Sequence, residues 1–132
     1  MNSSLPAWLP ASKVRPSNIT PVAWFAGSFD ALAATFSATP SRDRKGGGAG
    51  PVRSFFLRIG PRSVAELSEW EARPGQVELS LPVNARGVVW WEHFEAVMAH
   101  VPVPLEEVHR QGAFHWRRRQ AASQLPLDAG AE

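Results

Sequence analysis

The chain has 132 residues, of which 44% are hydrophobic, and its formal net charge at pH 7 is +2. That length and apolar content fit one domain with one core, while the absence of cysteine excludes disulfides, thiolate metal sites and thiol catalysis. No apolar run approaches the roughly 18 residues of a membrane span and no signal peptide is recognisable, so we expect an intracellular protein that is not secreted.

The positive charge is concentrated in the first half of the chain. Residues 1–62 carry eight basic and two acidic side chains, whereas residues 63–132 carry six basic and ten acidic ones. A cationic half favours an anionic partner, such as nucleic acid, an acidic protein surface or lipid headgroups. Ordinary solvated charge explains the same distribution equally well.

Residues 1–22 are interrupted by four prolines and are predicted to form an extended arm. Trp8, which two leucines flank, is a candidate hydrophobic anchor for a partner. A single domain is expected over residues 23–124, followed by a tail over residues 125–132.

A short helix is predicted after Ser28, whose hydroxyl can accept a hydrogen bond from the first turn. Apolar residues recur at helical spacing over residues 29–36. Residues 41–50 contain four glycines but lack the Gly-Lys-Ser/Thr end of a phosphate-binding loop, which predicts a flexible basic loop. Its basic residues are candidate contacts for nucleic acid or an acidic partner: Arg42, Arg44 and Lys45.

Three elements are predicted in the middle of the chain. Residues 52–59 are rich in phenylalanine and bounded by proline and glycine, which indicates a strand. Ser63 and Glu66 have the spacing of a capping box, so a helix is expected to begin there and to end before Pro74. Residues 76–83 alternate between apolar and polar side chains, which predicts a half-buried strand.

Residues 87–101 have the clearest helical pattern, with one broad apolar stripe that contains Phe94 and is expected to pack in the core. Trp90 and Trp91 are adjacent, so on a helix they point about 100° apart, and two indoles rarely share one small core. We interpret one as facing the sheet and the other as facing a second surface; the alternative is a wide stripe buried entirely against the sheet. Because tryptophan is enriched at binding hot spots, the candidate partner-binding residues are Trp8, Trp90 and Trp91.

A last helix is predicted from Pro104 to about Gln124, with acids in its first turn and arginines near its end, as the helix dipole prefers. Its second half interleaves aromatic and basic side chains, which is typical of surfaces that bind nucleic acid. Charge matching at the end of the helix explains the same placement without a ligand. The candidate contacts here for nucleic acid or an acidic partner are Trp116, Arg117, Arg118 and Arg119.

No cluster of residues has the pattern of a catalytic or metal site. His93 and His100 are about 10 Å apart along a helix, which is too far for one metal ion, and both are expected on its solvated face. Glu92 and Glu95 are expected on the polar face, where burial is insufficient to raise a carboxylate pKa for acid-base catalysis. We therefore expect no enzyme activity, no metal and no cofactor.

One segment resembles a known family, the PC4-like single-strand DNA-binding proteins. The strand-to-helix end of that family is similar to four pieces of this chain: Arg73-Pro74-Gly75, Leu79-Ser80-Leu81, Trp91 and Phe94. The resemblance implies a nucleic-acid-binding module. The chain departs from the family by an insertion before the tryptophan and lacks the family's basic, aromatic hairpin, so no functional residues are carried over.

Together these patterns predict an α+β fold in which a small antiparallel sheet is packed by the Trp-rich amphipathic helix, with extended arms at both ends. The expected function is a non-catalytic interaction or structural subunit that docks into a larger protein assembly through aromatic and Pro-rich surfaces. The alternative is a single-strand or duplex nucleic-acid-binding module. Salt separates the two, because binding to nucleic acid weakens steeply with ionic strength and apolar docking does not.

Overall fold

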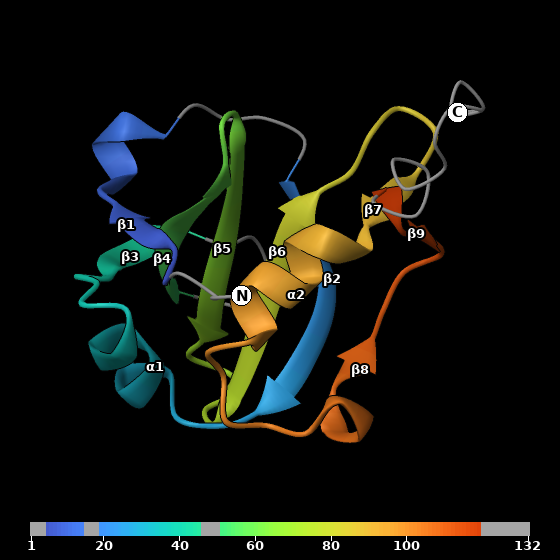
Figure 1. Ribbon diagram of the computed structural model, residues 1–132. Helices are drawn as coiled ribbons and strands as arrows, with labels where there is room; N and C mark the ends of the chain where they lie inside the picture. Colours follow the sequence, from blue (N-terminus) through green and yellow to red (C-terminus); the bar gives the residue numbers. More distant parts are fainter. Residues whose placement is uncertain (1–4, 15–18, 46–50, 120–132) are drawn as a thin grey trace, which may run out of the picture.

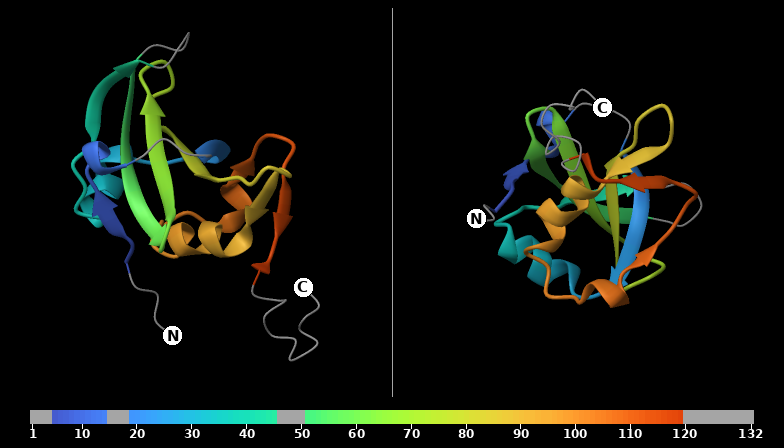
Figure 2. Two further views of the ribbon diagram at one scale, coloured as in Figure 1. Left: turned by 90° about the horizontal axis from the view of Figure 1, so that it is seen from above. Right: turned by 45° about the vertical axis from the view of Figure 1, so that its right-hand side comes forward.

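The computed structural model describes residues 5–14, 19–45 and 51–119. These residues form a curved antiparallel sheet with two α-helices, both packed on the same face (Figure 1). Seen from above, α2 lies along one side of the sheet (Figure 2). The predicted α+β class is therefore confirmed, with Trp91 in the helix that covers the sheet.

Seven strands form the main sheet in the order β1–β4–β5–β6–β2–β8, with β3 also pairing with β4. Strand β4 is ten residues long, so β1 covers one part of its outer edge and β3 covers another. The strands of this sheet are β1 (Ala7–Leu9), β2 (Ile19–Ala26), β3 (Ser41–Lys45), β4 (Pro51–Gly60), β5 (Ser63–Trp70), β6 (Gln76–Pro82) and β8 (His109–Arg110).

Three elements that the sequence predicted are confirmed. Helix α1 spans Phe29–Thr35, and the Ser28 hydroxyl accepts a hydrogen bond from the Ala31 backbone N–H at 3.0 Å. Strand β6 presents alternate residues to the core, because its apolar side chains are fully buried at every second position. Strand β4 likewise covers the predicted residues 52–59.

The helix predicted from Ser63 is wrong, because this segment is strand β5. Ala65 and Leu67 are fully buried on one face, which is the period of a strand. Glu66 accepts a hydrogen bond from the Ser68 hydroxyl, and no capped helix forms at Ser63. Backbone pairing with β4 on one side and β6 on the other outweighs the local capping pattern.

The long helix predicted over residues 87–101 is shorter and preceded by a strand. Strand β7 spans Val88–Trp90 and pairs in parallel with β9 (His115–Arg117), and α2 spans only Trp91–Met98. The two β-branched valines of β7 favour the extended conformation, so Trp90 ends a strand and occupies the N-cap position of α2 without a side-chain capping bond.

The last predicted helix is also wrong within the described residues. One 3-10 turn spans Leu105–Glu107, and the chain then continues through β8 and β9. Gly112 has a φ of 83°, a left-handed conformation that ends any right-handed helix between these strands. Residues 120–124 and the predicted tail over 125–132 lie outside the described residues.

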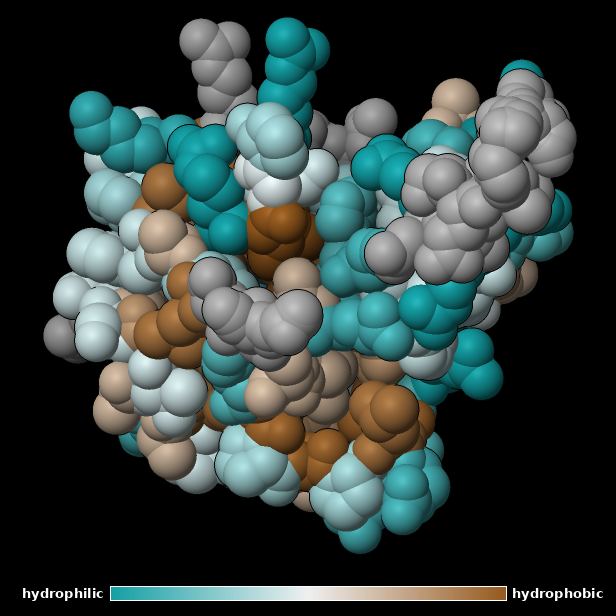
Figure 3. Space-filling view, viewed as in Figure 1, coloured by the Kyte–Doolittle hydropathy of each residue, from teal (hydrophilic) through white to brown (hydrophobic). Residues whose placement is uncertain are grey.

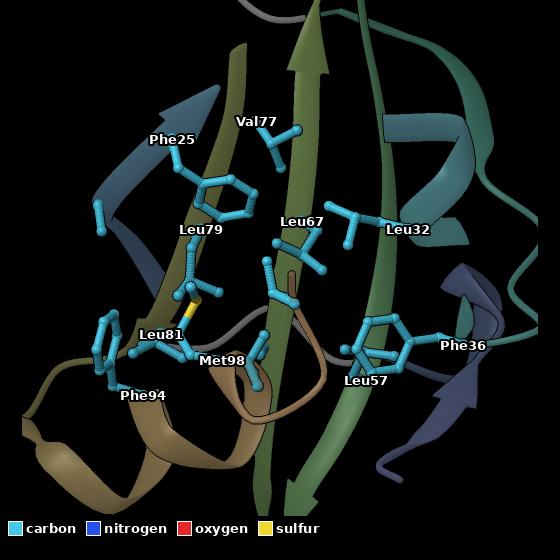
Figure 4. Packing of buried hydrophobic residues seen from close by; sticks show 14 of the residues in the cluster. Phe25, Leu32, Phe36, Leu57, Leu67, Val77, Leu79, Leu81, Phe94 and Met98 are labelled. Carbon is cyan, nitrogen blue, oxygen red and sulfur yellow. The ribbon is translucent and has the colours of Figure 1, made fainter. Parts of the chain in front are cut away.

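The core lies between the sheet and the two helices (Figure 4). Strand side chains form its floor, and Phe36 beside α1 and Met98 of α2 pack onto them from the same side. The fully buried large side chains of the strands are Phe25, Phe55, Leu57, Leu67, Leu79 and Leu81. Helix α2 thus has a fixed position against the sheet, and this position determines where its remaining faces point.

The described part of the predicted N-terminal arm belongs to the sheet. Ala7–Leu9 is extended, as expected, but it pairs with β4, and the Trp8 side chain packs against the core. Strand β2 begins at Ile19 and crosses the expected boundary between arm and domain. Of the predicted loop over residues 41–50, the first five residues form β3 and the rest lie outside the described residues. In the described part of the chain, no helix is long and apolar enough to cross a membrane.

Candidate functional site

An aromatic cluster of Trp91, Phe94 and Trp116 forms where α2 meets β9. The ring centroids are 4.8 Å apart for Trp91 and Phe94, 5.8 Å for the two tryptophans and 5.3 Å for Phe94 and Trp116. Trp91 and Phe94 are three residues apart on α2 and share a helix face. Trp116 reaches them because β9 pairs with β7, the strand that leads into the helix.

A guanidinium group lies over the ring of each tryptophan in this region. The guanidinium carbon is 4.8, 5.7 and 5.6 Å from the ring centroid in the pairs Arg119–Trp90, Arg118–Trp91 and Arg110–Trp116. All three distances are within the ~6 Å at which a cation is attracted to an aromatic face.

Two glutamates of α2 bind the residues that directly follow β9. The Glu95 carboxylate accepts a hydrogen bond from the Trp91 indole N–H at 2.8 Å and forms an ion pair with Arg118 at 3.4 Å. Glu92 accepts a hydrogen bond from the Arg119 backbone N–H at 3.0 Å. The acids on the polar side of α2 are therefore partners of the arginines that the sequence placed in a separate helix.

A groove of about 460 Å³ lies beside the aromatic cluster, between α2 and the 3-10 turn. Leu105 on its rim is 54% exposed, one of two large apolar side chains among the described residues that are so exposed. On the face shown in Figure 3, hydrophobic residues gather at the lower centre with hydrophilic residues around them. We call this feature the docking groove; its lining is Trp91, Phe94, Leu105, Glu106, Val108 and Arg110.

A second pocket of about 330 Å³ lies at the first turn of α2 and contains His93. The sequence predicted His93 on a solvated face, but only 8% of this residue is exposed. Burial lowers the pKa of His93, and the nearby Arg119 lowers it further, whereas Glu92 raises it. The prediction of an exposed histidine is wrong because the turn between β4 and β5 lies beside this part of α2.

The structure separates the three predicted partner-binding tryptophans. Trp8 packs against the core on β1, at the other end of the sheet order from β8. Trp90 is partly buried and lies under Arg119. Trp91 lies in both the aromatic cluster and the docking groove.

The predicted cationic contacts fall in two places. Arg42, Arg44 and Lys45 lie along β3, and their side chains are outside the described part of the structure. The second group lies on or just after β9. Arg117 is exposed there, whereas Trp116, Arg118 and Arg119 contact α2.

Sequence reasoning missed Leu105, Val108 and Arg110, because it placed all three on one helix. A local signal was present, because the β-branched Val108 favours a strand and Gly112, four residues later, favours a turn. Phe94 was predicted as core, and its second role as a wall of the groove follows only from the fold.

Other polar contacts hold the sheet together away from the groove. Arg53 forms ion pairs with Glu69 at 2.6 Å and Asp30 at 3.0 Å, and the hydrogen bond to Glu69 raises the pKa of Arg53. The Trp70 indole N–H donates to Glu78 at 3.0 Å, and Gln111 donates to the same carboxylate at 3.2 Å. Among the described residues, no group of three His, Cys, Asp or Glu is placed to hold a metal ion.

Comparisons with protein-family models, curated proteins and solved structures found no match for this chain.

Proposed function

We propose that this chain is a non-catalytic interaction module whose docking groove receives an apolar side chain from a protein partner. The observation that supports this most is the combination of an aromatic wall with an exposed leucine on the rim. Leu105 on the rim is 54% exposed and Trp91 on the wall is partly exposed, so the groove leaves apolar surface in contact with water. Covering that surface is favourable by about 25 cal/mol per Å².

The composition around the groove also fits a protein interface. Tryptophan and arginine are the residues most enriched at the centres of protein interfaces, and here they are stacked on one another. Residues 108–119 contain four arginines and no acid. Of these, Arg110 lines the groove, so the partner segment that fits best has an apolar side chain with a carboxylate beside it that meets Arg110.

The arrangement of cations supports protein docking over nucleic-acid binding. Arg53 and Arg118 are paired with acids of this chain, and Arg119 lies over Trp90. Trp116 is half-buried in a cluster, which leaves it poorly placed to stack on successive bases. Nucleic-acid binding remains the alternative that the following experiment distinguishes.

The test is quantitative affinity purification of the tagged 132-residue chain from its cells, in parallel with Leu105→Glu. Leu105→Glu adds a charge to the rim at an exposed position, so the fold is retained. Ala72→Glu is the matched control, because it adds the same charge at an exposed turn between β5 and β6. We expect a protein recovered in stoichiometric amount with the wild type and the control, and reduced at least about tenfold with Leu105→Glu.

Nuclease treatment separates the two functions in the same experiment. Recovery of the protein partner should survive nuclease and persist in moderate salt. If the material recovered is nucleic acid, or if all three chains recover the same proteins in the same amounts, the docking proposal is wrong.

A further inference from the structure

The residues that follow β9 are held against α2 close to the docking groove. The Arg118 guanidinium lies 5.7 Å from the ring centroid of Trp91, which lines the groove. The same guanidinium forms an ion pair with Glu95 at 3.4 Å, and the Arg119 backbone N–H donates a hydrogen bond to Glu92 at 3.0 Å. The chain that continues from Arg119 therefore starts at the first turn of α2, beside a wall of the groove.

Residues 120–132, which we call the trailing segment, have the composition that the groove favours in a partner. The run Leu125-Pro126-Leu127-Asp128 places two leucines beside a carboxylate. The trailing segment contains two acids and no basic side chain, whereas residues 108–119 contain four arginines and no acid. The trailing segment thus complements the surroundings of the groove both in charge and in apolar side chains.

The trailing segment is also long enough to reach the groove. Leu127 follows Arg119 by eight residues, which span at most ~26–29 Å when fully extended. An α-helix with its side chains is ~10–12 Å across, so eight residues can pass around α2 to the groove. Leu125 precedes a proline, which restricts its backbone to extended conformations and lowers the entropy lost on docking.

Arg110 is the cation that the groove offers to a carboxylate. It is exposed, its guanidinium carbon lies 5.6 Å from the ring centroid of Trp116, and it forms no ion pair with another described residue. Glu106 lines the same groove, so a carboxylate is favoured beside Arg110 and disfavoured beside Glu106. These two charges set the orientation of a docked segment that has one acid next to its leucine.

We propose that the trailing segment docks reversibly in the docking groove of its own chain, with Leu127 in the groove and Asp128 on Arg110, and that a protein partner must displace it. A tethered segment has an effective concentration on the order of millimolar, so even a weak contact is populated. The apparent affinity for a partner then falls with the fraction of chains whose groove is open. This inference rests on the proposed function, because the same groove receives the partner.

Paramagnetic NMR on the 132-residue chain tests the contact without a partner. The chain has no cysteine, so Ala131→Cys carries a single nitroxide label close to the proposed contact. We expect the methyl signals of Leu105 and Val108, which line the groove, to be broadened by the label and to recover when the nitroxide is reduced. The methyl signals of Leu9 on β1, at the other end of the sheet order from β8, should stay sharp.

Matched variants of the labelled chain identify the side chains involved. Leu127→Asn should remove the broadening of the groove methyls and Arg110→Gln should weaken it, and the spectra themselves show whether each variant is folded. Ala122→Asn and Arg117→Gln are the controls and should retain it, because Arg117 is exposed and does not line the groove. The proposal is overturned if the groove methyls stay sharp, if exposed methyls broaden equally over the whole surface, or if Leu127→Asn or Arg110→Gln behaves like the unsubstituted labelled chain.

Affinity purification separates this inference from the proposed function. Leu127→Asn should recover more of the partner than the wild type, because the groove is open in a larger fraction of chains, and equal recovery would overturn the competition. If Leu105→Glu reduces recovery but the label shows no contact, the proposed function stands and this inference fails. If the label shows the contact but Leu105→Glu leaves recovery unchanged, the proposed function fails while the contact of the trailing segment stands.

Discussion

Single residues of α2 have opposite surroundings although they are neighbours in the chain. Glu95 is exposed and bonds outward to Arg118, His93 is buried, and Phe94 packs inward against the core. The sequence pattern predicted Phe94 correctly, because its apolar neighbours recur at helical spacing. It could not predict His93, since burial of that ring depends on the β4–β5 hairpin, which lies distant in sequence.

The buried His93 makes stability depend on pH. The unfolded chain has a histidine pKa of about 6.5, and the folded pKa is lower, so the unfolded state binds the proton first as pH falls. Stability should therefore be unaffected well above pH ~6.5 and should decrease as the pH falls through the window between the two pKa values. Urea denaturation of His93→Gln at several pH values should show a smaller loss than the wild type.

His115→Gln is the control for that series, because His115 is exposed on β9. Its stability should follow the wild-type pH dependence. Equal pH dependence in His93→Gln and the wild type would show that burial of His93 does not shift its pKa in the folded state.

Phe94→Ala should be strongly destabilising. Phe94 is only 3% exposed and packs in the main core, so loss of its ring should lower the free energy of unfolding by about 3–5 kcal/mol. Leu105→Ala is the comparison, because an exposed leucine should cost about 0.5 kcal/mol or less. Thermal or chemical denaturation measures both, and similar losses in the two variants would contradict the placement of α2.

At the scale of elements, strands with strict alternation and the helix with a side-chain cap were predictable from local pattern. The cap at Ser28 and the alternation after Gln76 are both local signals. Strand β5 was not predictable in this way, because its capping-box residues match a helix start and only pairing on both sides makes it a strand. The same holds for β7 and β9, whose parallel pairing joins residues 88–90 with 115–117.

Strand β1 should contribute to stability as an element. It pairs along the outer edge of β4, and its Trp8 packs against the core while remaining partly exposed. Trp8→Ala should lower the free energy of unfolding by about 1–3 kcal/mol and reduce hydrogen-exchange protection in the paired part of β4. Unchanged stability and unchanged protection there would mean that this segment acts as a separate arm.

At the scale of the whole molecule, the sequence predicted the α+β class but not the site. The groove requires α2, the 3-10 turn and β8 to meet, and these elements were expected as two long helices. Of the partner-contact residues predicted from the sequence, Trp91 lines the groove, Trp116 packs edge to face against Trp91, and Trp8 lies in the sheet instead. Contacts that depend on a tertiary strand pairing cannot be read from local periodicity.

The central claim is that the docking groove binds a protein partner, and oxidative footprinting of the chain within its assembly tests it most directly. Mass spectrometry would compare side-chain labelling of the purified chain with labelling of the chain in its assembly. We predict strong protection of Leu105 and Val108 in the assembly, because both line the groove. Unchanged labelling of Leu105 and Val108, with protection confined to β1 or β3, would contradict the account.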